Sequence, residues 1–344
     1  NEFENVLGQK FGVDNLNCVQ RKDLADKTTV KPSDRFQRIT TALPNVFKYS
    51  ENKTMKSIGM EIGKEFIKTI SRVLEPPKIT SSRKNKKIVP RSGSWRVSEF
   101  IEPKKLHSWS VVCFDPSLKE HQVKTAIGTL IEILVVMGLN VQYPQKIIPG
   151  NPQDFKKTLA LVAQNKNTKV DLQLIVCILA NKFNGIYAEI KKICLIDLGI
   201  NSLCFQSRNI LRSRWKQICN NLALRINGKL GGTNSLQFQI NFILKYMIIG
   251  AYFSHPIAAI VASMDSFAVK YAGRYSKNKN LKNEIIEEID SIVIDFIKLF
   301  EDMNKYLPEA ILFYRESVTE RQFKIIMEHE VIKLLDAFKV FYQS

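Results

Sequence analysis

The chain has 344 residues, of which 45% are hydrophobic and 24% charged, a composition typical of a soluble protein with enough length for two cores. Lysine and arginine outnumber aspartate and glutamate by 51 to 33, which gives a formal net charge of +18. This excess favours a polyanionic partner, a nucleic acid first and an anionic membrane surface second.

The six cysteines and four histidines exclude the common metal-site spacings, because the sequence has no CxxC pair and its histidines are scattered. Several cysteines lie in apolar runs such as VVCF and LIVCIL, which indicates reduced, buried thiols in an intracellular protein. The longest apolar run, residues 126–139, carries Glu132 and is too short to span a bilayer. We therefore expect a cytoplasmic protein, with a nuclear one as the alternative.

The first third of the chain is polar and offers little apolar surface. Residues 1–47 predict one or two short helices without a core of their own. Beyond them, four apolar residues recur at every fourth position: Ile62, Phe66, Ile70 and Leu74. That spacing predicts an amphipathic segment, which the proline pair at 76 and 77 ends. The basic stretch 81–96 is either a solvated connector or an arm that contacts phosphates.

A regular alternation of strands and helices begins near residue 107. Strands are predicted at HSWSVVCF, LNVQYP, DLQLIVCIL and NSLCFQS, and each is followed by a helix of roughly a dozen residues. Apolar strands that alternate with helices are typical of a parallel sheet buried on both faces. Ligands of such sheets bind outside the carboxyl ends of the strands, and Tyr187 with Lys191 follows one of these ends.

A second unit follows the predicted helix stop LGGTN at residues 230–234. It predicts a strand at FILKYMIIGAYF, one strand at AAIVASMDSFAVKYAGRY, a long helix, a returning strand at EAILFYR and a final helix. Two strands before a long helix and a returning strand fit the start of an RNase H-like sheet.

Two predicted helices each carry a pair of binding side chains at i, i+4 spacing, which places both members of a pair on one helix face. Tyr187 pairs with Lys191, and Arg225 pairs with Lys229. A ring beside a lysine, with an arginine beside another lysine, suits a base stacked above a phosphate. A solvated basic helix face with a half-buried Tyr187 explains the same spacing equally well.

Long runs of the sequence resemble eukaryotic Argonaute proteins. The runs IYAEIKKICLIDLGINSLCFQSRNI and NNLALRINGKLGGTN resemble the Mid domain, whereas IIGAYFSHP, IAAIVASMDSFAVKYAGRY and ILFYRESVTERQF resemble the first half of the Piwi domain. The resemblance implies an α/β fold class, with a Rossmann-like Mid domain followed by an incomplete RNase H-like Piwi domain. The implied boundaries are a truncated PAZ-like remnant at 1–47, a linker at 48–106, Mid at 107–236 and the N-terminal part of Piwi at 237–344.

In that family the Mid pocket holds the 5′ phosphate and first base of a small guide RNA. The resemblance therefore implies that Tyr187 stacks on the base and that three cations surround the phosphate. The implied guide-end residues are Tyr187, Lys191, Asn209, Arg225 and Lys229. Lys182 lies in the loop that reads the first base, but this loop is one residue longer here, so no base preference is implied. No cofactor is expected, with a Mg²⁺ ion at the guide phosphate left open.

At one position of the implied Mid pocket, the residue differs from the one that the family has. Leu203 stands where the family has a glutamine. Loss of a hydrogen bond to a charged group costs about 1.5–3 kcal/mol, so the expected phosphate site is weakened but not abolished.

The positions that match the metal-binding carboxylates of slicing Argonautes are Tyr252, Glu284 and Glu316. Tyr252 replaces the first aspartate, and a neutral phenol cannot bridge two Mg²⁺ ions. Glu316 replaces the second aspartate with a longer side chain, and no histidine can be assigned as the final ligand. Asp265 is a candidate substitute, for which a structural role at a strand end is expected instead. We therefore predict no functional catalytic site and no metal site.

The resulting prediction is a non-slicing, monomeric Argonaute-like protein of RNA silencing. Its expected partners are single-stranded small RNA with a 5′ phosphate, the target RNA and proteins of the silencing complex, but no membrane. Three alternatives stay open: a residual RNase H-like endoribonuclease with a rebuilt metal site, a scaffold or decoy that binds no RNA, and a poorly folding product with an exposed sheet edge.

Overall fold

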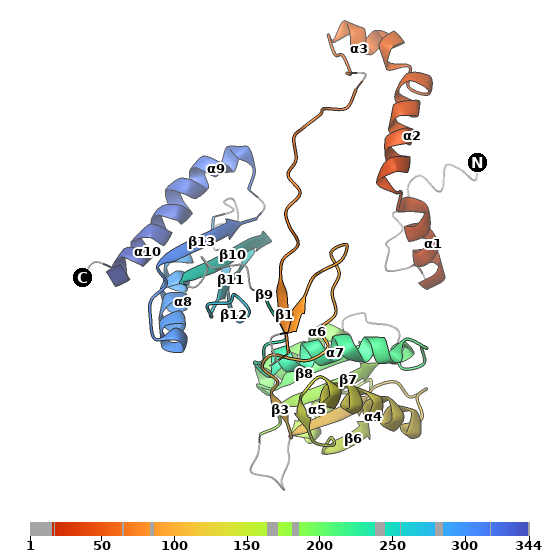
Figure 1. Cartoon of the computed structure of the whole chain (residues 1–344), viewed down its shortest axis with the longest axis vertical. Coiled ribbons are helices and arrows are strands. Elements are labelled where there is room, and N and C mark those ends of the chain that lie inside the picture. The colour runs from red at the N-terminus through yellow and green to blue at the C-terminus, as the bar shows by residue number, and fades with distance from the viewer. Residues whose placement is uncertain are drawn as a thin grey trace. The chain divides into compact units, whose positions relative to one another are not determined.

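The structure is a computed structural model, drawn in Figure 1, that describes residues 16, 18–63, 65–82, 86–163, 171–180, 186–237, 245–254, 256–278, 285–316 and 318–342. The chain divides into two compact units, Asn1–Leu74 and Glu75–Ser344. Among the described residues, no helix combines the length and the apolar composition that crossing a membrane requires.

The regular structure described in the first unit is a series of short helices. They are α1 (Cys18–Thr28), α2 (Pro32–Asn45), the 3-10 turn η2 (Tyr49–Glu51) and α3 (Lys53–Ser57). The Asn52 side chain begins α3 by accepting hydrogen bonds from the backbone N–H groups of Thr54 and Met55. Neither α2 nor α3 buries a residue, in agreement with the predicted lack of a core.

The amphipathic segment expected near residues 62–74 is wrong, because residues 66–74 form neither helix nor strand. Ile67 and Ile70 are 97% and 101% exposed. Short helices are marginal in water without an apolar surface to cover, and in the described part of this unit the one ring contact of the segment is that of Phe66 with Phe36, at 4.6 Å between centroids.

Four parallel strands form the sheet predicted after residue 107. They are β4 (Trp109–Cys113), β6 (Lys146–Pro149), β7 (Leu174–Leu179) and β8 (Asn201–Gln206), in the spatial order β6-β4-β7-β8. The second strand of the sheet was predicted at LNVQYP, but β6, which follows that segment, takes its place. Residues 140–141 form the two-residue β5, which pairs with β3 (Lys105–Leu106) in a separate small sheet.

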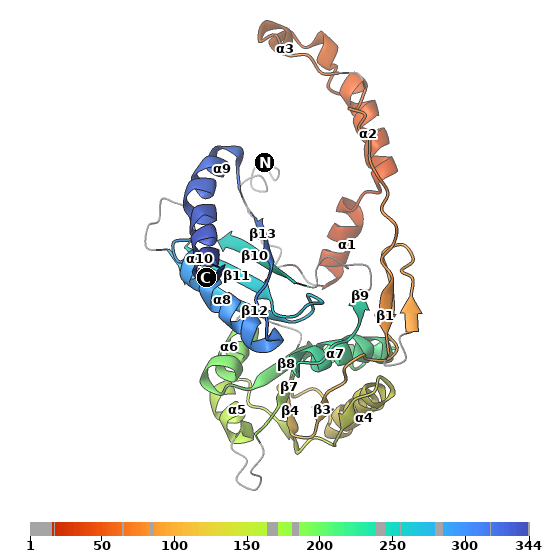
Figure 2. The ribbon, with the colours of Figure 1, turned by 60° about the vertical axis from the view of Figure 1, so that its left-hand side comes forward.

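Helices cover both faces of this parallel sheet (Figure 2). On one face lie α4 (Glu120–Val136) and α7 (Trp215–Lys229), and on the other lie α5 (Phe155–Ala163), α6 (Ile186–Lys192) and the π-helical turn η3 (Ile193–Asp197). Val111 packs on the first side and Val112 on the second, and neither is exposed. Burial on both faces explains why the strands are apolar throughout.

Strands that come before and after the parallel sheet along the chain pair with one another in a separate sheet. β1 (Ile79–Ser81) lies between β2 (Lys86–Ile88) and β9 (Leu236–Gln237), and both neighbours are antiparallel to it. Part of the basic stretch 81–96 is therefore a β-strand rather than a plain connector.

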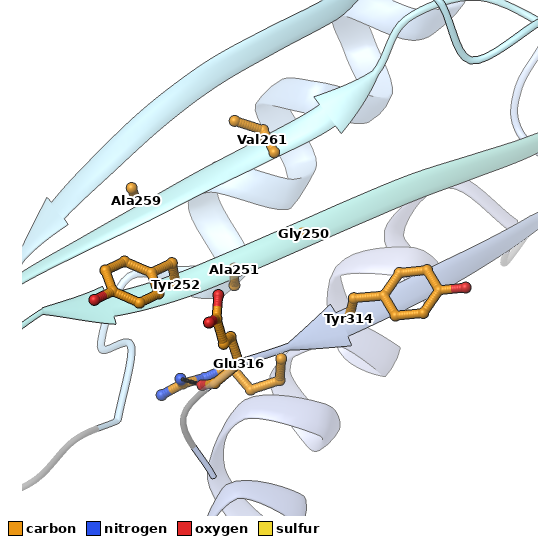
Figure 3. Close-up of a pocket in the computed structure, with 8 residues that line it drawn as sticks. Gly250, Ala251, Tyr252, Ala259, Val261, Tyr314 and Glu316 are labelled. Atoms are coloured by element: carbon orange, nitrogen blue, oxygen red, sulfur yellow. Dashed lines mark hydrogen bonds between the residues drawn. The ribbon is translucent and has the colours of Figure 1, made fainter. Parts of the chain in front are cut away.

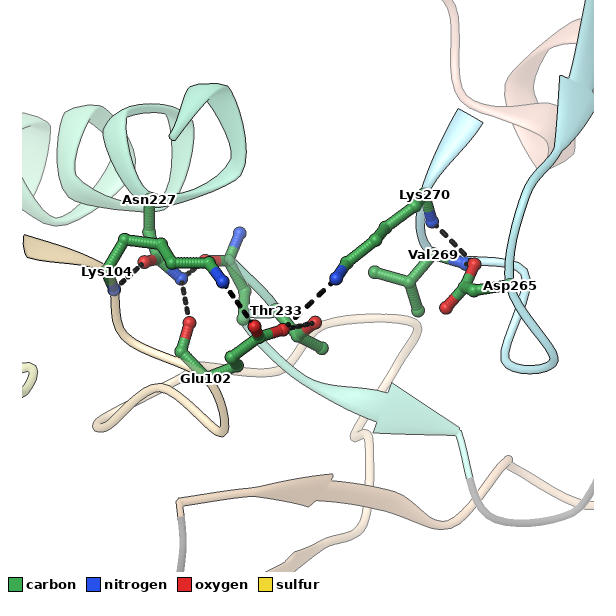
Figure 4. A network of polar contacts seen from close by, with 8 residues as sticks. Glu102, Lys104, Asn227, Thr233, Asp265, Val269 and Lys270 are labelled. Atoms are coloured by element: carbon green, nitrogen blue, oxygen red, sulfur yellow. Dashed lines mark hydrogen bonds and ion pairs between the residues drawn. The ribbon is translucent and has the colours of Figure 1, made fainter. Parts of the chain in front are cut away.

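Asn227 joins α7 to the segment before the parallel sheet, as Figure 4 shows. It is fully buried; its Nδ2 donates to the Glu102 carbonyl (3.2 Å) and to Asn234 Oδ1 (3.0 Å), while its Oδ1 accepts from the Lys104 N–H (3.0 Å). The Glu102 carboxylate bonds Lys104 and Thr233 and pairs with Lys270 at 3.3 Å. The pKa of the Glu102 carboxyl is lowered, and the hydrogen bond from Lys104 is the largest cause.

Asn227→Ala is expected to lower the free energy of unfolding by about 2 kcal/mol, because the Lys104 N–H and Asn234 Oδ1 each lose the hydrogen bond that Asn227 makes with them. Urea denaturation measures the change. The matched control is Asn220→Ala on the same helix, whose amide makes only an exposed bond to the Lys216 carbonyl and which is expected to change stability by less than about 0.5 kcal/mol. Equal losses of stability in the two variants would contradict the conclusion that the buried Asn227 amide stabilises the fold through its hydrogen bonds.

The second sheet is mixed. Its strands are β10 (Tyr246–Ser254), β11 (Ile257–Ser263), β12 (Tyr271–Lys277) and β13 (Ala310–Arg315), in the order β12-β11-β10-β13. β10 is parallel to β13, and the other pairs are antiparallel. α8 (Ile289–Asn304) and α10 (Ile332–Tyr342) pack against one face, and α9 (Glu320–Ile326) leads into α10 through the π-helical turn η5 (Met327–Val331).

The single strand predicted over AAIVASMDSFAVKYAGRY is wrong, because this segment forms the hairpin of β11 and β12. Asp265 causes the turn: its Oδ1 accepts from the backbone N–H groups of Val269 and Lys270, both at 2.8 Å. Ala268 in this turn has a φ of 51°. The structural role expected for Asp265 is thereby confirmed.

Candidate nucleic-acid interface

The predicted guide-end residues gather along β8, which is an edge strand of the parallel sheet. α7 folds back along β8, so its last residue, Lys229, lies beside the first residue of the strand, and the Lys229 carbonyl accepts from Asn201 Nδ2 at 3.2 Å. Lys191 contacts Ser202 and the end of α7 contacts Asn201, so these two contacts lie at the amino end of β8, whereas the sequence predicted a ligand outside the carboxyl ends of the strands.

Lys191 is fixed between β8 and the Tyr187 ring. Its Nζ donates to the Ser202 carbonyl at 2.6 Å and to Ser202 Oγ at 2.8 Å. The same Nζ lies 5.5 Å from the centroid of the Tyr187 ring, a cation–π distance. Tyr187 is 46% exposed, so one part of the ring packs and another part is open to a ligand. The i, i+4 spacing on α6 does bring the two side chains together.

Lys229 shares an electrostatic environment with the other two cations. Its pKa is lowered, first by burial and next by the charge of Lys191, while Arg225 acts in the same direction and Cys204 in the opposite one. In the part of the chain that the structure describes, none of the three cations forms an ion pair with a carboxylate. Three like charges without a counter-ion form a site that favours an anion.

Lys191, Arg225 and Lys229 form the cation cluster, and the other predicted positions are less clearly part of it by their contacts. Asn209 ends the 3-10 turn η4 (Ser207–Asn209) that follows β8, and its carbonyl accepts from the Arg212 N–H. Within the described residues, no hydrogen bond joins its side chain to the cluster. Leu203 is 2% exposed and packs with the α4 and α7 side of the sheet. Lys182 lies outside the described residues.

Tyr252 and Glu316 line a second, shallow pocket of about 480 Å³, shown in Figure 3. Tyr252 is near the end of β10, and Glu316 directly follows β13, the parallel neighbour of β10. The Glu316 N–H donates to the Ala251 carbonyl at 3.0 Å, which places both positions at the same end of the sheet. The topology thus brings together the two positions that the resemblance associates with slicing.

The residues of this pocket do not fit a two-metal site. Glu316 is the one carboxylate among the described residues that line it, and Tyr252 is 48% exposed. Across the described ranges, no three His, Cys, Asp or Glu side chains gather in a way that suits a metal ion. Glu284 lies outside the described residues. Arg315 is committed to an ion pair with Glu330.

Comparisons with known proteins agree with this fold. The Piwi domain family model matches residues 174–344. Protein argonaute 18 of Oryza sativa subsp. japonica is 27% identical over 98% of this chain and 33% of its own length. The chain spans about a third of the length of the curated relatives it matches.

Solved structures share the architecture at lower identity. The crystal structure of Kluyveromyces polysporus Argonaute with a guide RNA has a TM-score of 0.79 at 18% identity and covers 97% of this chain and 41% of that one. The Mid and Piwi domains of N. crassa QDE-2 have a TM-score of 0.63 at 21% identity over 70% of this chain and 72% of that one. These likenesses show an α/β fold with an RNase H-like Piwi sheet, as predicted. The chain belongs to the eukaryotic Argonaute family.

Proposed function

We propose that the chain binds the 5′-phosphorylated end of a single-stranded small RNA at the cation cluster, with the first base on Tyr187. The observation that carries the proposal is the set of three cations beside an open aromatic ring, none of them neutralised by a carboxylate among the described residues. Base–aromatic stacking contributes about 1–3 kcal/mol, and a terminal phosphate offers a compact double charge.

The three cations would bind the phosphate in different ways. Lys191 uses two of its three N–H donors on Ser202 and retains one for an anion. Arg225 is exposed and offers a planar fork that can bind two phosphate oxygens. Lys229 is partly desolvated and repelled by its neighbours, so an incoming anion raises its pKa toward the ordinary value. Leu203 contributes no hydrogen bond here, which supports a weakened site.

The relatives support a role in a small-RNA pathway. The K. polysporus structure contains a guide RNA, and we extend that ligand class to this chain as part of the proposal. The target RNA would pair with the bound small RNA, and other proteins of the silencing complex would act with it. A Mg²⁺ ion at the phosphate remains compatible with the proposal.

Salt dependence tests the ionic character of the binding. If three cations neutralise phosphate charge, the logarithm of the association constant should fall as the logarithm of the salt concentration rises. For single-stranded RNA the expected slope is about −2. Fluorescence anisotropy of a labelled RNA with a 5′ phosphate measures it. A slope near zero, or no binding at low salt, would favour a scaffold that does not bind RNA.

We further propose that the chain does not cut RNA. Tyr252 supplies no carboxylate at its position, and Glu316, the one carboxylate among the described residues that line the pocket, cannot by itself hold the two Mg²⁺ ions that would clamp the attacking and leaving oxygens. No cleavage product is expected when the loaded chain is incubated with a complementary RNA and Mg²⁺. Product that disappears in the Glu316→Ala variant would instead establish a rebuilt nuclease site.

A further inference from the structure

Three thiols lie close enough to Lys191 of the cation cluster for its charge to lower their pKa values. Cys177 in β7 and Cys204 in β8 are partners in the register of the two parallel strands. Both pack with the α5 and α6 side of the sheet, and Cys194 from η3 belongs to the same group. Neighbouring strands lie about 4.7–4.9 Å apart, which is within the Cα separation that a disulfide accepts, about 4.4–6.8 Å.

The members of this pair differ in exposure. Among the cysteines whose side chains the structure describes, Cys113, Cys177, Cys194 and Cys219 are buried, and Cys204 is half-buried. A reagent from solvent therefore reaches Cys204 before it reaches Cys177.

The charges around Cys204 favour its thiolate. The Cys177 thiol donates a hydrogen bond to it, and Lys191 of α6 and Lys229 of α7 add positive charge, so the pKa of Cys204 is lowered despite its burial. The pKa of Cys177 is raised, first by that hydrogen bond and then by burial. On the η3 side, Cys194 has a pKa raised to about 11 and stays protonated.

We propose that Cys204 is a peroxide-reactive thiol with Cys177 as its resolving partner, and that a phosphate bound at the cation cluster shields it. Shielding rests on the proposed function, whereas reactivity does not. Sensor cysteines elsewhere combine an accessible thiolate with a neighbouring thiol in the same way.

The chemistry needs hydrogen peroxide as the oxidant. The Cys204 thiolate attacks one oxygen, the O–O bond breaks, and hydroxide leaves, so sulfur is oxidised to a sulfenic acid and peroxide is reduced. The Cys177 sulfur then attacks the Cys204 sulfur. The S–O bond breaks, the Cys177 proton leaves with the hydroxyl group as water, and a disulfide forms between β7 and β8.

The experiment treats the folded full chain with limiting hydrogen peroxide, blocks remaining thiols with N-ethylmaleimide and locates the products by peptide mass spectrometry. We expect a Cys177–Cys204 disulfide, while Cys219, whose pKa is raised to about 12 by burial, remains a free thiol as the internal control. In Cys177→Ser the sulfenic acid on Cys204 should accumulate and react with dimedone. In Cys204→Ser neither product should form. Oxidation of Cys194 or Cys219 before Cys204, or an inert Cys204, would overturn the proposal.

Alkylation rates test the role of the lysines and of the phosphate. At a fixed pH below the thiol pKa, Lys191→Met should slow the reaction of Cys204 with iodoacetamide by about threefold for each unit of pKa increase, since higher thiolate nucleophilicity offsets part of the lost thiolate. RNA with a 5′ phosphate should slow the wild-type reaction at least about tenfold at saturation, and RNA with a 5′ hydroxyl should not. RNA that binds without slowing it would overturn the shielding. Failure of RNA to bind at all would refute the proposed function and shielding together, with the peroxide reactivity of Cys204 decided separately by the disulfide experiment.

Discussion

Replacement of both Lys191 and Lys229 by alanine is expected to lower the affinity for 5′-phosphorylated RNA by about 10²- to 10⁴-fold. Each lysine would donate at least one hydrogen bond to a charged oxygen, which is worth about 1.5–3 kcal/mol, and each 1.4 kcal/mol changes the dissociation constant tenfold. Both ammonium groups lie within the cation cluster: that of Lys191 is held by Ser202, and that of Lys229 is close enough to Lys191 for its pKa to be lowered by that charge. Equilibrium titration with a labelled RNA measures the loss.

The matched control is Lys216→Ala. Lys216 is an exposed lysine at the beginning of α7, whereas Lys229 is at its end, so both variants remove the same charge from the same helix. The control should change affinity by less than about threefold, as expected for a distant, screened charge. If Lys216→Ala weakens binding as much as Lys229→Ala does, the binding is diffuse and the cation cluster is not its site.

Removal of the Glu330 carboxylate is expected to have the largest effect on stability. The Arg315 guanidinium donates through Nε to Glu330 Oε2 at 2.9 Å, and Glu330 Oε1 accepts from the Ile286 N–H at 2.9 Å. Their side chains are 7% and 0% exposed. Glu330→Ala leaves the buried Arg315 guanidinium without its carboxylate counter-ion, which costs about 3–5 kcal/mol. Urea denaturation should show this loss of unfolding free energy.

Two further variants separate charge from packing. Asp336→Ala breaks the exposed pair with Lys339 on α10 and should cost less than about 1 kcal/mol. The double variant Arg315→Met with Glu330→Met replaces both charges by apolar side chains and should recover much of the stability that Glu330→Ala loses. A double variant as unstable as Glu330→Ala would show that packing, and not the uncompensated charge, causes the loss.

The sequence alone predicted the parallel sheet because burial on two faces leaves a continuous apolar signal. Val111 and Val112 are neighbours that pack on opposite sides, and the whole of β7 is buried. The i, i+4 pair of Tyr187 and Lys191 was also predictable, since a helix of fixed pitch brings those side chains together.

Other features depend on contacts that no local pattern encodes. The β11–β12 hairpin was missed because its turn depends on one side chain, Asp265, bonding two backbone N–H groups inside a run that looks like a strand. The contacts of Lys191 and of the end of α7 with the amino end of β8 follow from how α6 and α7 pack on the sheet. The pairing of Cys177 with Cys204 is a matter of strand register, which neither apolar run specifies by itself.

The most direct test of the account is the affinity of the chain for one short single-stranded RNA prepared with a 5′ phosphate and with a 5′ hydroxyl. The cation cluster predicts that the phosphorylated RNA binds at least about tenfold more tightly, since at least one charged hydrogen bond is lost with the phosphate. It also predicts that the difference disappears when Lys191 and Lys229 are both replaced by alanine. Equal affinity of the wild-type chain for the two RNAs would contradict the account and identify the chain as a scaffold or a nonspecific RNA binder.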